Sequence, residues 1–257
     1  MSTNSVLFII FFYTKMKIKV ELRSSKLGVL WLLLQPILFL VIYYISFRYL
    51  LKSKDITSIA SCLVGLISYN WFSQTINEGT VSLIGSKGIT NSTVVPSYTF
   101  IISSSLVCLW RYLFVLTVFL LFISLHDSSE LLTLNLIYLL PVILFAFLVF
   151  TSVSFLLAAV YPVLPDIKHI VDSFTKLFLF ISCIFYEVKA VPEDMKFYFL
   201  LNPLSFLISN LRAIFLGGEF QGFSFVLSSI LIFGLVSILG LVLYNRNQYK
   251  YNYINTI

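Results

Sequence analysis

The chain has 257 residues, of which 59% are apolar and 11% charged, and its mean hydropathy is +0.98. A soluble domain carries about a quarter charged residues, so this composition excludes an ordinary soluble enzyme. The net charge is +6. The basic residues flank apolar runs instead of forming a patch on a polar surface, which favours a membrane partner and no nucleic acid.

Residues 1–27 are predicted to be an N-terminal interface segment that precedes a transmembrane domain over residues 28–257. Residues 6–13 are apolar, and residues 15–22 alternate between basic and apolar side chains. Such a segment suits the membrane surface, with lysine and arginine among the headgroups. The alternation has a period of two, which leaves a strand open beside a helix.

Six apolar runs are each predicted to form a transmembrane helix, because a span needs about 20 mainly apolar residues. They cover residues 28–47, 56–76, 97–125, 131–161, 173–186 and 223–244. The fifth run is short unless it begins near Ile167. The predicted fold is all-α and integral to the membrane. Both termini are predicted to be cytoplasmic, since lysine and arginine are then more numerous inside.

Two loops carry unusual patterns. Residues 78–95 are rich in glycine, serine, threonine and asparagine, and form a predicted cytoplasmic loop that ends at Pro96. Residues 187–222 lie outside and contain an apolar stretch, 197–211, interrupted by Asn202 and Pro203. Proline breaks a helix, so this stretch predicts a pair of outer half-helices, re-entrant or interfacial, between spans five and six.

No catalytic or metal-binding constellation is recognisable. The sequence has no phosphate-binding loop, no H-E-x-x-H and no G-x-S-x-G motif. His126 and His169 lie on opposite sides of the predicted membrane, and the three cysteines lie in apolar runs with no metal-ligand spacing. All acidic residues fall in loops or at the ends of spans, whereas ion-coupled transporters usually keep a carboxylate inside the membrane. The driving energy is therefore expected to come from another subunit.

Arg111 lies near the centre of the third span, where an unpaired arginine costs several kcal/mol. Two interpretations stay open: a phosphate or sugar contact along a substrate pathway, or a packing or snorkelling arginine. Two interpretations also stay open for the aromatic residues Tyr43, Tyr44, Tyr69, Trp71 and Phe72. They suit a belt at the membrane interface, or they stack on sugars along the pathway.

Several short strings follow one another in a recognisable order. They are Lys26-Leu27-Gly28-Val29-Leu30-Trp31 with Gln35-Pro36, Gly65-Leu66 with Trp71-Phe72, Pro96, Asp166-Ile167-Lys168-His169-Ile170, and Val191-Pro192-Glu193 with Asn202-Pro203-Leu204, Arg212 and Gly217-Gly218. The ordered set resembles the bacterial polysaccharide-export ABC transporter permeases, which are membrane subunits of type-2 ABC exporters. The resemblance runs from residue 20 to residue 245.

The resemblance implies a channel of two copies of this chain, with two copies of a separate ATPase subunit beneath it. Mg-ATP binds that ATPase, so this chain itself needs no cofactor and is not an enzyme. The N-terminal segment is implied to be an amphipathic interface helix. The implied residues for docking on the ATPase are Gly85, Ser86, Lys87, Gly88, Ile89 and Thr90. The implied residues of an outer re-entrant gate are Pro192, Asn202, Pro203 and Arg212.

The implied cargo is a lipid-linked polysaccharide that crosses the bacterial cytoplasmic (inner) membrane. O-antigen is the leading cargo, followed by capsule or teichoic-acid precursors and then by drugs or lipids. A polytopic membrane glycosyl or acyl transferase and a purely structural membrane subunit are the alternatives of other classes. The sequence departs from the family pattern at residues 91–95, at Pro165, and at Ser182 and Cys183. These departures concern the coupling and gating contacts.

Overall fold

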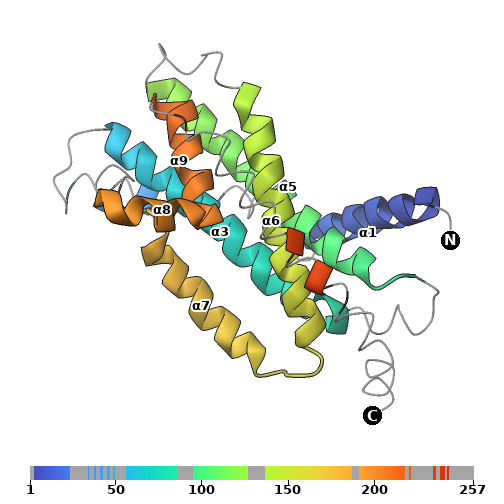
Figure 1. The fold of residues 1–257 in the computed structure, drawn as a ribbon. Coiled ribbons are helices and arrows are strands. Elements are labelled where there is room, and N and C mark those ends of the chain that lie inside the picture. The colour runs from blue at the N-terminus through green and yellow to red at the C-terminus, as the bar shows by residue number, and fades with distance from the viewer. Residues whose placement is uncertain are drawn as a thin grey trace.

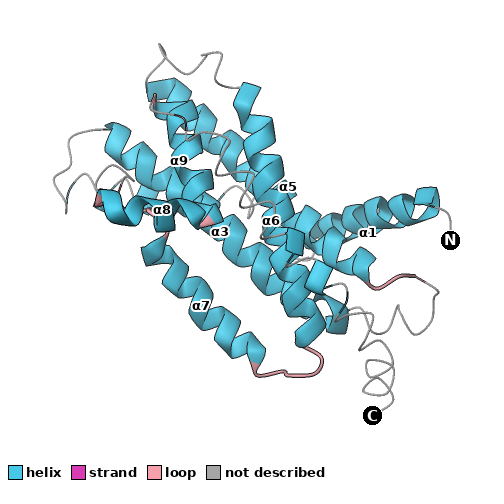
Figure 2. Cartoon of the chain, viewed as in Figure 1, coloured by secondary structure: helices cyan, strands magenta, loops and turns pink. Residues whose placement is uncertain are grey.

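The computed structural model describes residues 3–23, 56–85, 95–126, 137–186 and 191–217, with isolated residues between 34 and 49 and between 220 and 242. All regular structure among these residues is helical, which confirms the predicted all-α class for this part (Figures 1 and 2). The principal helices are α1 (Thr3–Arg23), α3 (Ile56–Gly85), α5 (Tyr98–His126), α6 (Leu139–Val160), α7 (Ile167–Ile181), α8 (Glu193–Leu201) and α9 (Pro203–Leu216).

Two of the described helices are long and apolar enough to cross a bilayer. They are the segment Tyr98–Leu121 of α5 and the whole of α6, while α9 is a shorter apolar helix. The predicted fourth span begins later than expected, at Leu139. The predicted first and sixth spans, 28–47 and 223–244, lie almost entirely outside the described residues. The number of spans therefore stays a prediction.

The prediction that a polar loop begins at residue 78 is wrong, because α3 continues to Gly85. The polar side chains of this stretch find partners while the backbone stays helical. The hydroxyl of Thr80 donates to the carbonyl of Ile76 at 2.7 Å, and that of Ser82 donates to the carbonyl of Gly79 at 2.7 Å. Hydroxyls that bond back to the preceding turn let a helix carry polar residues among apolar neighbours.

α7 begins at Ile167, where the fifth span needed to begin to reach full length, but it stops at Ile181. The predicted end of the span at residue 186 is therefore wrong. Residues 182–186 bend, and Cys183 has a φ of 53°. A non-glycine residue in this left-handed region cannot continue a right-handed helix.

α3 is the central helix of the described part and packs against α5, α6, α7 and α9 (Figure 1). Several of its contacts are between aromatic rings. Trp71 stacks on Tyr112 of α5 with ring centroids 4.2 Å apart, and meets Phe150 of α6 edge-on at 5.0 Å. Phe72 contacts Phe150 at 5.1 Å and Phe178 of α7 at 5.2 Å. These pairs add to the stability that area burial supplies.

α1 is a helix, which decides between the two structures that its alternating sequence left open. It lies beside the first half of α5 and projects away from the bundle (Figure 1). Ser103 donates to the carbonyl of Ile10 at 3.3 Å, and the rings of Tyr13 and Phe100 meet edge-on at 4.8 Å. Buried or half-buried positions repeat every four residues along α1, namely 5–6, 9–10, 13–14, 17–18 and 21–22.

The helices α3 and α6 approach most closely at Gly79. A Cβ atom at this glycine would lie 2.5 Å from the Cβ of Ser154. The hydroxyl of Ser154 donates to the carbonyl of Thr75 at 2.9 Å and thus bonds to the backbone of the neighbouring helix. Small residues at such crossings are common in membrane helix pairs, because they let the backbones come together.

Gly79→Ala is therefore expected to destabilise the protein, because its methyl group would overlap Ser154. Overpacking of this kind costs about 1–3 kcal/mol. The measurement is the thermal unfolding temperature of the purified protein in detergent.

Gly85→Ala is the matched control, since nothing lies within 4 Å of a Cβ placed there. It should leave the unfolding temperature unchanged or raise it slightly, because alanine favours helix over glycine. Adding Ser154→Gly to Gly79→Ala should restore most of the loss. Equal unfolding temperatures for the two alanine variants would contradict close packing at Gly79.

Candidate functional site

The break between α8 and α9 is built by Asn202 and Pro203, as the sequence predicted. Asn202 has an extended backbone, with φ −70° and ψ 115°, and its side-chain oxygen accepts a hydrogen bond from the amide of Leu204 at 3.0 Å. Pro203 is the first residue of α9, a position where its missing N–H is not needed. The Asn202 side chain also donates to the hydroxyl of Ser182 at 2.9 Å, which links the break to the end of α7.

α9 begins inside the bundle and runs back along α6. Phe206, near its start, meets Phe145 at 5.4 Å, whereas Phe220, beyond its end, meets Tyr138 just before α6 begins, at 5.0 Å. Residues 203–208 and 210–215 of α9 are buried. α8 differs, because Asp194, Met195 and Tyr198 are exposed there. Pro192 precedes α8 and is exposed as well.

Arg212 of α9 fastens the unwound end of α7. Its guanidinium donates to the carbonyls of Cys183, Ile184 and Tyr186 at 2.8, 2.6 and 2.9 Å. It also donates to the carbonyl of Ser61 in α3 at 3.1 Å. The bend after α7 frees these loop carbonyls, and a buried carbonyl needs a partner. Arg212, itself 9% exposed, therefore joins α3, α9 and the segment after α7.

The contact between α3 and this segment is tight as well. A Cβ atom at Gly65 would lie 3.2 Å from the Cα of Ile184. Cys183 and Ile184 are fully buried. The outer-gate residues Asn202, Pro203 and Arg212 thus belong to one packed unit, while Pro192 lies at its exposed edge. Their role in gating stays a prediction.

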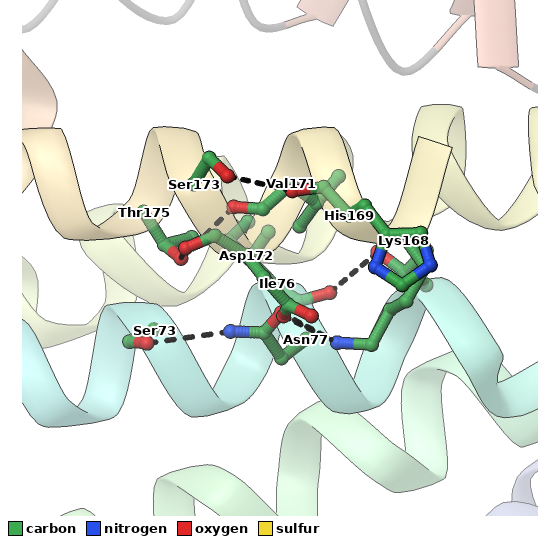
Figure 3. Close-up of polar contacts among 10 residues, drawn as sticks. Ser73, Ile76, Asn77, Lys168, His169, Val171, Asp172, Ser173 and Thr175 are labelled. Atoms are coloured by element: carbon green, nitrogen blue, oxygen red, sulfur yellow. Dashed lines mark hydrogen bonds and ion pairs between the residues drawn. The ribbon is translucent and has the colours of Figure 1, made fainter. Parts of the chain in front are cut away.

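A second polar cluster joins α3 and α7 near the ends that carry Gly85 and Ile167 (Figure 3). The ammonium of Lys168 donates to the carboxylate of Asp172, one turn further on, at 2.7 Å, and to the side-chain oxygen of Asn77 at 2.8 Å. The Asn77 amide in turn donates to Ser73, one turn earlier in α3, at 3.3 Å. Lysine therefore bridges two helices that otherwise meet through apolar side chains.

Arg111 of α5 contacts the adjacent flank of α3 and has two acidic partners. Its Nε and Nη2 reach the two carboxylate oxygens of Glu21 at 2.8 and 3.1 Å. Its Nη1 donates to the carboxylate of Glu78 and, at 3.4 Å, to the side-chain oxygen of Gln74. The arginine charge is thus compensated by two carboxylates from α1 and α3. This pairing explains how a charge is accommodated in the middle of an apolar helix.

Lys17 lies close to this cluster on α1. Its ammonium donates to the hydroxyl of Ser104 at 3.4 Å and lies 5.4 Å from the ring centroid of Tyr13. Burial lowers the pKa of Lys17, and the carboxylates of Glu78 and Glu21 oppose that shift. The two cations, Arg111 and Lys17, face two anions, so the cluster is formally neutral.

The predicted substrate-pathway aromatics are divided by the fold. Trp71 and Phe72 are buried in the core of the single chain, with exposures of 2% and 6%, and Tyr69 is half-buried. Tyr43 and Tyr44 lie outside the described residues. Stacking of Trp71 or Phe72 on a sugar requires the helices around α3 to separate. The pathway assignment of these residues, and of Arg111, stays a prediction.

Sequence reasoning missed Glu21, Asn77 and Glu78 as structural partners. The signal was present in the spacing, since Ser73 with Asn77 and Gln74 with Glu78 are polar pairs four residues apart. Such pairs lie on adjacent flanks of one helix. A loop that begins at residue 78 divides these helical pairs, so the predicted loop hides the pattern.

Of the predicted ATPase-docking residues, the described part of the chain contains Gly85. It is the last residue of α3 and is exposed. Ser86, Lys87, Gly88, Ile89 and Thr90 lie outside the described residues, as do the departures at residues 91–94. The docking role of this segment stays a prediction.

An apolar helical bundle with charges compensated inside it is typical of a membrane transport subunit. Residues 9–216 match the ABC-2 type transporter family, and the chain belongs to this family. It is 24% identical over 241 residues to the O-antigen export system permease protein RfbA of Klebsiella pneumoniae, covering 93% of this chain and 91% of the relative. The RfbA protein of Myxococcus xanthus is 25% identical over 202 residues, which cover 77% and 76% of the two chains. The polysialic acid transport protein KpsM of Escherichia coli is 26% identical over 240 residues, covering 90% of each chain.

Arg212→Lys is expected to lower the free energy of unfolding by about 2–3 kcal/mol. An ammonium cannot reach carbonyls on both α3 and the segment after α7, so some buried carbonyls lose their donor. The measurement is the thermal unfolding temperature in detergent. Arg23→Lys, the same change at the exposed end of α1, is the control and should leave it unchanged. If the two variants unfold alike, Arg212 does not hold the end of α7.

Proposed function

We propose that this chain is the permease subunit of an ATP-driven exporter that moves a lipid-linked polysaccharide, O-antigen, across the bacterial inner membrane. One observation carries the proposal: the similarity to an O-antigen export permease covers 93% of this chain and 91% of the relative. Similarity at that coverage extends through the N-terminal helix, the bundle and the outer segment. The similarity therefore covers nearly the whole chain and is more than the match of a single pair of helices.

A capsular polysaccharide is the second candidate cargo. The observation that favours it is the 26% identity to a polysialic acid transport protein, over 90% of both chains. Both cargoes are long glycans, so the same architecture suits either of them.

In this proposal the energy comes from a separate ATPase subunit that binds Mg-ATP. The sequence contains no phosphate-binding loop, and α3 carries its polar residues towards Gly85, where the docking segment begins. Two copies of the permease and two of the ATPase form the exporter. Each permease has six spans, with both termini in the cytoplasm.

α1 is the interface helix in this proposal. Leu7, Phe8, Phe11 and Phe12 are each at least 58% exposed, and they occupy one side of α1. Lys15 and Lys19 continue this side towards the helix end. An apolar side followed by lysines suits a helix that lies in the headgroup region, with the aromatic rings towards the acyl chains.

The segment from α8 to α9 is the outer gate in this proposal. α9 lies within the bundle while α8 stays exposed. The proposal is that the pair enters and leaves the apolar layer from the same side. At its break the amide of Leu204 bonds to the Asn202 side chain, and Arg212 of α9 bonds to the carbonyl of Cys183 in the irregular segment after α7, so these irregular backbones have protein partners, as structure at membrane depth requires.

The test is co-purification of the tagged permease with the ATPase encoded beside it, followed by mass spectrometry of the retained lipid. We expect a stable complex that retains a lipid-linked glycan, and loss of surface glycan when the permease gene is deleted. Retention of a free drug or a phospholipid alone would assign another cargo. A permease that binds no ATPase and transfers sugar or acyl groups by itself would overturn the proposal.

Gly88→Pro is expected to uncouple ATP hydrolysis from export, because proline removes a backbone donor and fixes φ in the segment proposed to dock on the ATPase. ATP hydrolysis by the purified complex and surface glycan in cells are measured together. Export should fall by about tenfold or more, the scale of a typical coupling free energy. Ser124→Ala, at an exposed position near the outer end of α5 in this topology, is the control; equal export by both variants would contradict docking at this segment.

A further inference from the structure

Arg111, Glu21 and Glu78 form an ionic junction between three helices. Glu21 belongs to the last turns of α1, Glu78 to the last third of α3, and Arg111 to the middle of α5. The carboxylate of Glu21 is bound by two nitrogens of the guanidinium, at 2.8 and 3.1 Å. A guanidinium that binds a carboxylate through two of its own nitrogens has a fixed orientation, so the junction fixes the position of the end of α1.

The junction is partly shielded from water. The side chains of Arg111, Glu21 and Glu78 are 22%, 32% and 37% exposed. A partly buried guanidinium that loses a carboxylate keeps a charge that water solvates incompletely, so the three groups favour staying together. α1 also contacts α5 through hydrogen bonds from Ser103 to the carbonyl of Ile10 and from Lys17 to the hydroxyl of Ser104.

The junction also lies between the proposed docking segment at the end of α3 and the helix α1. α3 runs without a break from Glu78 to Gly85, and the proposed docking segment follows directly. α1 packs along α5, and Arg111 joins Glu21 of α1 to Glu78 of α3. A displacement of the end of α3 therefore reaches α1 through charges that cannot separate cheaply.

We propose that Arg111 is a positioning residue that transmits the movement of α3 to α1 during the ATP cycle, and is not a contact for the cargo. The proposal rests on the proposed function, since it requires an ATPase that moves α3. The geometry argues against a direct phosphate contact, because both sides of the guanidinium are already occupied by carboxylates. A phosphate would have to displace Glu21 or Glu78 to bind there.

The experiment uses the complete permease–ATPase complex with the neutral variants Glu21→Gln and Glu78→Gln. The readouts are ATP hydrolysis by the complex and surface glycan in cells. We expect hydrolysis to continue while export per ATP falls by about fivefold or more, the lower range of measured couplings. If Arg111 instead contacts the cargo phosphate, freeing it from a carboxylate leaves export unchanged or raises it, and that result overturns the proposal.

A purely structural role is tested with a triple variant, Glu21→Gln, Arg111→Met and Glu78→Gln. Replacement of a buried ion cluster by uncharged residues often restores stability, because no unpaired charge is left. We expect this variant to recover its unfolding temperature but to stay uncoupled. Recovery of wild-type export per ATP would reduce the junction to a stability device and overturn the proposal.

Asp166→Asn provides the matched control, since it removes a carboxylate at an exposed position just before α7, where the side chain makes no capping hydrogen bond. It should leave export per ATP at the wild-type value, and a loss equal to that of Glu78→Gln would overturn the specific role of the junction. Failure of the proposed function is recognised separately. In that case the wild-type complex itself exports no glycan, before any variant is compared.

Discussion

Polar groups that lie among apolar side chains must find their partners within the protein, because little water competes for them there. α3 meets this constraint on two flanks. One flank pairs Glu78 with Arg111, and the other pairs Asn77 with Lys168. Its buried hydroxyls bond back along the helix, as Ser68 does to the carbonyl of Val64 at 2.8 Å. The neighbouring helices α1, α5 and α7 are oriented by these pairings as well as by the aromatic core.

The same constraint shapes the end of α7. A residue with positive φ, Cys183, stops the helix and exposes carbonyls that no longer have helical partners. Arg212 supplies the missing donors, and Asn202 supplies both the cap of α9 and a bond to Ser182. An irregular segment thereby becomes a fixed part of the bundle. Such a segment changes shape by exchanging one set of partners for another, not by gradual bending.

The sequence predicted the features that depend on local chemistry. The break at Asn202 and Pro203 follows from proline itself, and the apolar helices α5 and α6 follow from their composition. It did not predict the continuation of α3 beyond residue 76, because a glycine-rich polar stretch has the composition of a loop. The partners of Arg111 and Arg212 were also missed, since they come from residues up to 151 positions away in the chain. Such contacts depend on which helices become neighbours, and no local pattern contains that information.

In the proposed six-span topology α3 is the second span, and its length then has a consequence for how the protein sits in a bilayer. α3 has 30 residues, which at 1.5 Å per residue make a rod about 45 Å long, some 15 Å more than the hydrocarbon layer. The apolar portion, residues 56–76, spans about 31 Å and matches that layer closely. The surplus is the polar portion with Glu78 and Gly85. Hydrophobic mismatch therefore resists vertical sliding of α3, because movement either way draws polar residues into hydrocarbon or pushes apolar ones into water.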